Sequence, residues 1–183
     1  MVILITGASH TGKTMLAQRI LEQCRYPYLC MDHIKMGLIR SGNTELTPED
    51  DEALVSVLWP ICREIMKTAI ENHQNLIVEG CYVPFSWREE FDEDQLKSIK
   101  FVCLGMTDKY IEEHFYDIAA HESDIEYRTV DTDISIEGLK KENERYIKGF
   151  KAAGERVVLV GLNHAQTILG LARSLSYRLP TKK

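Results

Sequence analysis

The sequence contains no long hydrophobic run, because its apolar stretches are short and are interrupted by polar residues or glycine. A helix that crosses a bilayer needs about 20 consecutive apolar residues. The apolar run at residues 2–5 is also too short for a secretory signal, and it continues directly into a glycine-bounded loop. We therefore expect a cytoplasmic protein that has no membrane partner.

Clusters of basic residues are also missing. The chain has 22 Lys and Arg against 28 Asp and Glu, a formal net charge of −6, and its basic runs, such as Lys182-Lys183 at the C-terminal end, are no longer than two residues. A nucleic-acid surface requires clustered Lys and Arg. The composition therefore argues against a nucleic-acid partner.

The five cysteines form no C-x-x-C pair, and their number is odd. Cys30, Cys81 and Cys103 lie within or beside apolar runs, where cysteine behaves as a small hydrophobic residue. This pattern argues against a disulfide framework or a zinc site and fits a reducing compartment.

Five short apolar runs are present, and each is typical of a buried strand. Segments with helical periodicity separate them, and this alternation predicts a parallel α/β sheet with helices on both faces. The length of 183 residues fits a single domain covering residues 1–183. The expected strands are residues 2–6, 28–31, 76–79, 99–104 and 157–161.

The helical segments carry start and stop signals. Thr47 and Pro48 are typical of an N-cap and a first helical position, and Pro60 is expected to kink or divide the helix that follows. An apolar stripe in residues 108–121 indicates a helix that faces the core. Residues 122–135 are polar and acidic with Arg128 as their only arginine, which predicts a loop or lid. The remaining expected helices are residues 15–21, 33–40, 136–153, which Ser135 would cap, and 164–179.

The first strand leads into a complete G-x-x-x-x-G-K-T motif followed by a helix, the order that a P-loop requires. The two glycines allow the backbone to wrap a phosphate, and the backbone N–H groups at the helix N-terminus attract the anion. The lysine can reach the β- and γ-phosphates, and the threonine hydroxyl can bind Mg²⁺. The motif therefore predicts a nucleoside triphosphate site formed by Gly7, Ala8, Ser9, His10, Thr11, Gly12, Lys13 and Thr14.

With two further motifs the chain resembles the adenylate-kinase-like branch of P-loop kinases, which includes nucleoside monophosphate and small-metabolite kinases. One motif is Met31-Asp32-His33-Ile34-Lys35, which ends in Arg40-Ser41-Gly42, and the other is Val78-Glu79-Gly80. The resemblance implies a three-layer α/β/α fold with a five-stranded parallel sheet in the order 2-3-1-4-5. It also implies ATP and Mg²⁺ as cofactors and a small soluble molecule as phosphoryl acceptor.

The same resemblance implies roles for individual residues. Asp32 would take the proton of the acceptor hydroxyl or orient it, although it could instead cap a helix starting near His33. Lys35 and Arg40 would grip an acidic or phosphorylated acceptor, or could be solvated cations. Glu79 would hold Mg²⁺ through water together with Thr14, or contact the acceptor. Arg128 would act on the transferring phosphate, with Arg145 and Arg88 as reserves.

Two departures from the family pattern bear on the acceptor. The expected lid has a single arginine where the family usually has more, and the stretch 82–87 is aromatic rather than polar. This stretch casts doubt on a nucleoside monophosphate and allows a partly apolar acceptor, but its aromatic residues could equally belong to the core. The sequence does not identify the acceptor.

Three functions remain open. The leading prediction is a kinase that uses ATP and Mg²⁺ to phosphorylate a small soluble acceptor, because a simple nucleotide binder has no need of the strand-two acid. The alternative is a nucleotide-binding regulator that hydrolyses ATP slowly. A weaker alternative is a toxin-like or antibiotic-modifying kinase. GTPases are not favoured, because no guanine-reading N-K-x-D follows any expected strand.

Overall fold

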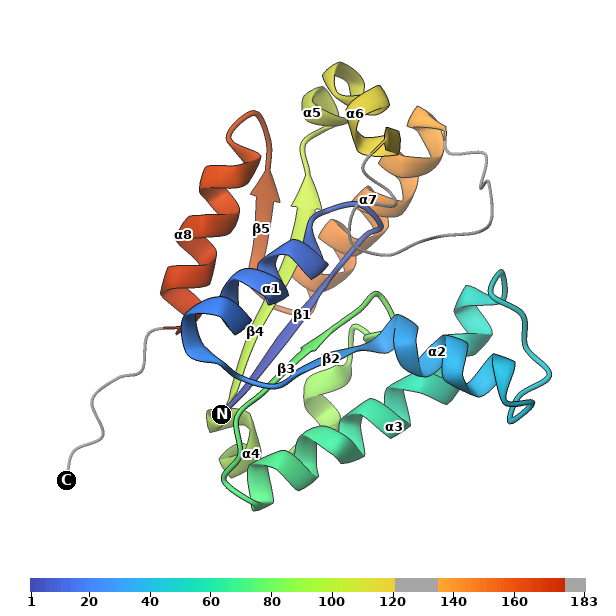
Figure 1. Ribbon diagram of the computed structural model, residues 1–183. Coiled ribbons are helices and arrows are strands. Elements are labelled where there is room, and N and C mark those ends of the chain that lie inside the picture. The colour runs from blue at the N-terminus through green and yellow to red at the C-terminus, as the bar shows by residue number, and fades with distance from the viewer. Residues whose placement is uncertain (121–134, 177–183) are drawn as a thin grey trace.

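A computed structural model describes residues 1–120 and 135–176. Its centre is a sheet of five parallel strands in the order β2-β3-β1-β4-β5 (Figure 1). This architecture confirms the predicted three-layer fold and the strand order. The strands are β1 Val2–Gly7, β2 Tyr28–Cys30, β3 Leu76–Glu79, β4 Ile99–Met106 and β5 Val157–Val160.

Helices cover both faces of the sheet, and the alternation of side chains along β1 shows why. Val2 and Leu4 belong to one buried cluster, whereas Ile3 and Ile5 belong to the other. The first cluster includes residues of α2 Met31–Arg40, α3 Asp51–Glu71, α4 Glu93–Lys97 and α7 Ile136–Ala152. The second includes residues of α1 Lys13–Cys24, α5 Asp108–Glu113, α6 Phe115–Ala120 and α8 His164–Ser176.

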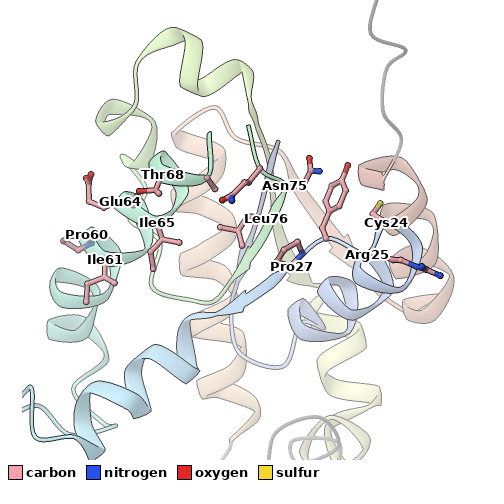
Figure 2. Close-up of a pocket in the computed structure, with 13 residues that line it drawn as sticks. Cys24, Arg25, Pro27, Pro60, Ile61, Glu64, Ile65, Thr68, Asn75 and Leu76 are labelled. Carbon is pink, nitrogen blue, oxygen red and sulfur yellow. The ribbon is translucent and has the colours of Figure 1, made fainter. Parts of the chain in front are cut away.

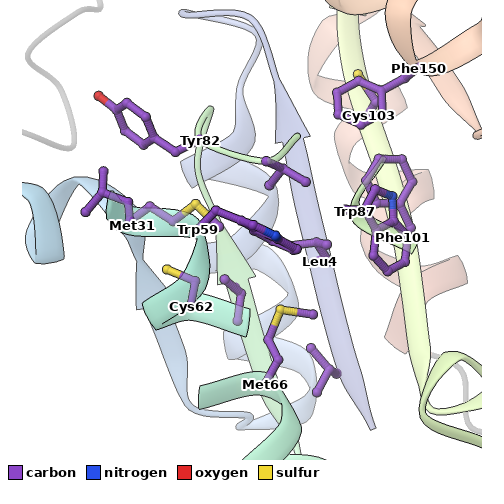
Figure 3. Packing of buried hydrophobic residues seen from close by; sticks show 14 of the residues in the cluster. Leu4, Met31, Trp59, Cys62, Met66, Tyr82, Trp87, Phe101, Cys103 and Phe150 are labelled. Atoms are coloured by element: carbon purple, nitrogen blue, oxygen red, sulfur yellow. The ribbon is translucent and has the colours of Figure 1, made fainter. Parts of the chain in front are cut away.

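Large aromatic side chains fill the cluster on the α3 side (Figure 3). Trp87 stacks on Phe101 with ring centroids 5.2 Å apart, and Trp59 and Phe150 pack in the same cluster. Trp87 opens a short 3-10 helix, η1 Trp87–Glu90. Tyr82 and Trp87 are both buried, so the ends of the aromatic stretch 82–87 are core.

The long helix α3 differs from its prediction at its start and at its proline. It begins at Asp51 rather than at Pro48, because the Asp50 carboxylate accepts hydrogen bonds from the N–H and the hydroxyl of Thr47 and closes a turn there. These bonds also lower the pKa of Asp50. The helix continues through Pro60 without dividing, held on the core by neighbours such as Trp59 and Cys62.

Other boundaries were also missed. The predicted helix 108–121 is divided at His114 into α5 and α6, but its stripe of Ile111, Phe115 and Ile118 packs into the core as expected. The short elements η1 and α4 were not predicted. Residues 122–134 of the expected lid and 177–179 of the last helix lie outside the described residues. Within the described ranges no helix is long and apolar enough to cross a membrane.

The register of the sheet brings the predicted site residues together at the carboxyl ends of the strands. Ile5 pairs with Glu79, and Glu79 pairs with Cys30, so Ile5 of β1 is level with the ends of β3 and β2, and β1 continues two residues further to Gly7. A Cβ on Gly7, whose φ is +142°, would lie 2.1 Å from the carbonyl oxygen of Leu104. The glycine therefore lets β1 and β4 approach closely where the P-loop begins.

Candidate active site

The P-loop connects β1 to α1 and is held by contacts within itself. The hydroxyl of Thr11 and the ammonium of Lys13 both donate to the carbonyl of Ala8, at 2.9 and 2.8 Å. Gly12 precedes α1 with a φ of +87°. The first N–H groups of a helix have no intrahelical acceptor and favour an anion. This geometry supports phosphate binding by residues 7–14, which stays a prediction.

The predicted metal ligands lie together beside this loop. The hydroxyl of Thr14 is 3.4 Å from Oε1 of Glu79, and the phenol of Tyr28 donates to the same oxygen at 2.8 Å. Glu79 is only 1% exposed. Burial, and then the Glu79 carboxylate, raise the pKa of Tyr28, so this phenol stays protonated and fixes the carboxylate.

These oxygens fit Mg²⁺. Magnesium usually binds through one or two protein oxygens together with substrate phosphates and water. In the described part of the chain no three His, Cys, Asp or Glu side chains gather as a metal site. A hydroxyl and one carboxylate at the end of the P-loop are therefore suited to a metal that arrives with the phosphates.

The predicted acceptor side is only partly assembled. The helix α2 begins at Met31 with Cys30 as its N-cap, so the interpretation of Asp32 as the cap is wrong. Asp32 forms an ion pair with Lys35 at 3.3 Å, and Lys35 donates to the Tyr82 hydroxyl at 2.7 Å. Arg40 is exposed in the last turn of α2, about 12 Å along the helix from Asp32. The structure brings Asp32 and Lys35 together but leaves Arg40 apart.

A cavity of about 520 Å³ lies next to the P-loop. Ser9 forms part of its wall, and the other walls come from the start of α3, the segment after β3, and one face of α7. Its lining residues are Ser9, Asp51, Glu52, Val55, residues 81–85, Glu142, Arg145 and Tyr146. This size is suitable for a small molecule.

The position of α7 sets the shape of this cavity. The buried amide of Asn143 bonds the backbone N–H and carbonyl of Met106 at 2.7 and 2.6 Å, and the Tyr146 hydroxyl donates to the Cys81 carbonyl at 2.6 Å. The neighbouring Glu142 is thereby placed against the P-loop, where it accepts bonds from the N–H and the hydroxyl of Ser9, both at 3.1 Å.

The acids around the cavity act on Cys81. Burial is the largest cause that raises the pKa of Cys81 to about 12, and Asp32, Asp51 and Glu142 raise it further, while Lys13 opposes them. The P-loop lysine, the predicted base and two acids of the cavity wall are therefore all close enough to influence one thiol.

The three candidate arginines have different positions. Arg128 lies outside the described residues, so its role stays a prediction. Arg145 lines the cavity, with its guanidinium 6.0 Å from the centre of the Tyr146 ring. Arg88 forms an ion pair with the buried Glu155 and is therefore engaged in the structure.

Three residues near the site were missed by reasoning from the sequence. Tyr28 stands at the start of a strand, and Glu142 stands in a charged helical run that resembles a solvated face. His164, the first residue of α8, stacks on Tyr110 with the rings 5.9 Å apart and bonds the backbone of Thr11. Its burial lowers its pKa. No local motif marks any of these contacts, which form only through the fold.

A larger groove of about 990 Å³ lies near the amino ends of β2 and β3 (Figure 2). The helix α3 forms one side with Ile61 and Ile65, and the connection from α1 to β2 forms the other with Pro27. Leu76, also in its lining, begins β3, whereas Glu79 ends that strand. Ligands of α/β sheets bind at the carboxyl ends of the strands. We therefore assign the site to the smaller cavity beside the P-loop.

No known family profile matches the chain, and no curated protein matches it. Similar solved structures include a gluconokinase from Sinorhizobium meliloti 1021, with 18% identity, a TM-score of 0.56, and coverage of 96% of this chain and 93% of that chain. A shikimate kinase from Bacteroides thetaiotaomicron has 11% identity, a TM-score of 0.59, and coverage of 97% and 99%. The shikimate kinase from Aquifex aeolicus vf5 has 14% identity, a TM-score of 0.53, and coverage of 96% of this chain and 96% of that chain. The likeness confirms the expected three-layer α/β/α fold.

Proposed function

We propose that this chain is an ATP- and Mg²⁺-dependent kinase that transfers the γ-phosphoryl group of ATP to a hydroxyl of a small molecule. The observation that carries the proposal is that the P-loop and the 520 Å³ cavity share Ser9. A phosphoryl group held by the loop would therefore adjoin a small molecule in the cavity. The fold shared with gluconokinase and shikimate kinase structures supports the same reaction class.

On the nucleotide side, the loop N–H groups and Lys13 hold the phosphates. When the phosphates bind, the Lys13 ammonium leaves the Ala8 carbonyl and donates to phosphate oxygens instead. Thr14 and Glu79 would hold Mg²⁺, and Tyr28 keeps the Glu79 carboxylate in place. When bound there, the metal would neutralise charge on the β- and γ-phosphates.

On the acceptor side, the hydroxyl oxygen attacks the γ-phosphorus. The new O–P bond forms as the bond to the β–γ bridging oxygen breaks, ADP leaves, and the hydroxyl proton passes to the Asp32 carboxylate. Lys35, at 3.3 Å, orients that carboxylate. Arg145 on the cavity wall, and Arg128, offer positive charge to the transferring group.

A screen of metabolites for ATP consumption tests this function, with phosphate release in their absence as the control. We expect at least one acceptor to stimulate ADP formation and to become phosphorylated. Turnover without acceptor that equals the best rate with acceptor would contradict the proposal and favour a regulator that hydrolyses ATP slowly.

A further inference from the structure

The charges on the cavity wall are strongly unequal. Among the described residues, three carboxylates line it, those of Asp51, Glu52 and Glu142, against one guanidinium, that of Arg145. Arg145 lies three residues after Glu142 on α7, so the acid one turn earlier offsets its charge. The wall therefore has a net charge of about −2 at neutral pH.

Lys35, a cation next to the wall residue Tyr82, does not reverse this balance. Lys35 is held by the Asp32 carboxylate at 3.3 Å and by the Tyr82 hydroxyl at 2.7 Å, and that hydroxyl in turn donates to Asp51 at 2.9 Å. The ammonium is thus engaged in a chain of contacts that contains the two carboxylates of Asp32 and Asp51. It is not presented to an anionic ligand.

Neutral side chains on the wall respond to this negative field. The pKa values of Cys81, Tyr82 and Tyr146 are all raised, chiefly by burial; in each case Asp51 raises the pKa further, while Lys13 opposes this at Cys81 and Arg145 opposes it at Tyr146. A bound ATP would add the negative charge of its γ-phosphate beside Ser9. An acceptor with a carboxylate or phosphate would enter against both fields, whereas a cation would be attracted by them.

The rest of the wall is apolar. Val55, Val83, Pro84 and Phe85 take part in the lining, together with the ring of Tyr146. These side chains can cover the carbon skeleton of a small ligand, and a protonated amine is attracted both to the carboxylates and to aromatic faces.

We propose that the acceptor is a small hydroxyl-bearing molecule that carries a protonated amine, of the amino-sugar or amino-alcohol class, and not a sugar acid or a phosphorylated compound. The inference rests on the proposed kinase function. The amine lies toward Asp51 and Glu52, and a hydroxyl lies toward Ser9 and is the nucleophile. The protonated amine has no free electron pair, so phosphoryl transfer occurs on oxygen and ADP is the leaving group.

Charge fractionation tests the acceptor class without knowledge of its identity. The small-molecule fraction of a cell extract is separated by ion exchange at pH 7 into cationic, neutral and anionic pools. Each pool is incubated with the full chain, Mg²⁺ and γ-labelled ATP, and label in non-nucleotide products is measured. We expect transfer to the cationic pool. Transfer to the neutral or anionic pool alone would overturn this inference and leave the kinase function standing, whereas transfer to none would contradict the kinase function.

Substitution of Glu52 tests the wall itself. Glu52→Gln removes one charge from an exposed position and should raise KM for the acceptor of the active pool about fivefold, the effect of one screened ion pair, with little change in kcat. Glu52→Asp should keep most of the affinity. Glu49→Gln, an exposed acid nearby that does not line the cavity, is the matched control and should behave as the wild type. Equal KM values in Glu52→Gln and Glu49→Gln would overturn the inference.

Discussion

The two halves of the candidate site are built in different ways. The P-loop is one contiguous stretch, residues 7–14, and much of its chemistry comes from backbone N–H groups and a helix N-terminus. The cavity beside it is assembled from four segments that are far apart in the sequence, and its chemistry comes from side chains. The loop therefore needs little more than its own sequence, whereas the cavity depends on how α7 and α3 dock.

Two large effects are expected, and the first is on the P-loop itself. Lys13→Ala should lower phosphoryl transfer about 10³-fold, because the ammonium is aimed at charge that develops in the transition state. The ammonium donates to the Ala8 carbonyl of its own loop, so the fold should remain intact without it. Steady-state rates measure the loss, and circular dichroism checks the fold. Unchanged turnover would contradict the assignment of the nucleotide site.

The next effect separates the two halves. Asp32→Asn should lower kcat by about 10²–10⁴-fold, the usual loss for a general base, and leave the affinity for ATP nearly unchanged. Because Asp32 is not the N-cap of α2, its replacement has no capping effect to confuse the result. Initial rates at varied ATP and acceptor give both constants. Full activity would move the role of base to another acid, with Glu79 as the next candidate.

The docking of α7 should matter to the cavity and not to the loop. Asn143→Ala removes two buried hydrogen bonds and leaves the N–H and carbonyl of Met106 without them. The free energy of unfolding should fall by about 2–4 kcal/mol, since an unsatisfied buried polar group costs about 1–3 kcal/mol. Urea denaturation measures this loss. In the folded variant, KM for the acceptor should rise more than KM for ATP, and an equal rise in both would contradict this separation.

The smallest effect concerns the metal. Tyr28→Phe removes the hydrogen bond that fixes Oε1 of Glu79, and the Mg²⁺ concentration for half-maximal rate should rise roughly tenfold, as for other residues that orient metal ligands. Glu79→Gln should raise it further, because it removes the negative charge itself. Magnesium titrations of initial rate compare the two variants with the wild type. An unchanged Mg²⁺ requirement in both would place the metal elsewhere.

This difference between the halves also explains what could be predicted from the sequence. The P-loop, the acid ending β3 and the alternation of strands and helices are local patterns, and the fold agrees with them. Glu142 reaches Ser9 across more than 130 residues, and Tyr82 meets Lys35 only after β3 and α2 pack together. No spacing rule reports such contacts.

The predicted start of α3 and the predicted break at Pro60 differ from the structure for local reasons. Thr47 and Pro48 carry the signals of a helix start, but the Asp50 carboxylate captures the Thr47 N–H and hydroxyl and delays the helix to Asp51. Pro60 is a helix breaker by propensity, yet α3 continues through it because the surrounding side chains are packed in the core.

The claim that the nucleotide half works independently of the acceptor half is tested most directly by calorimetric titration of a non-hydrolysable ATP analogue with Mg²⁺. We expect the wild type and Asp32→Asn to bind one analogue per chain with dissociation constants within about twofold. Lys13→Ala should bind at least about tenfold more weakly, a difference of about 1.4 kcal/mol. Absence of binding to the wild type, or equal affinity in Lys13→Ala, would contradict the account.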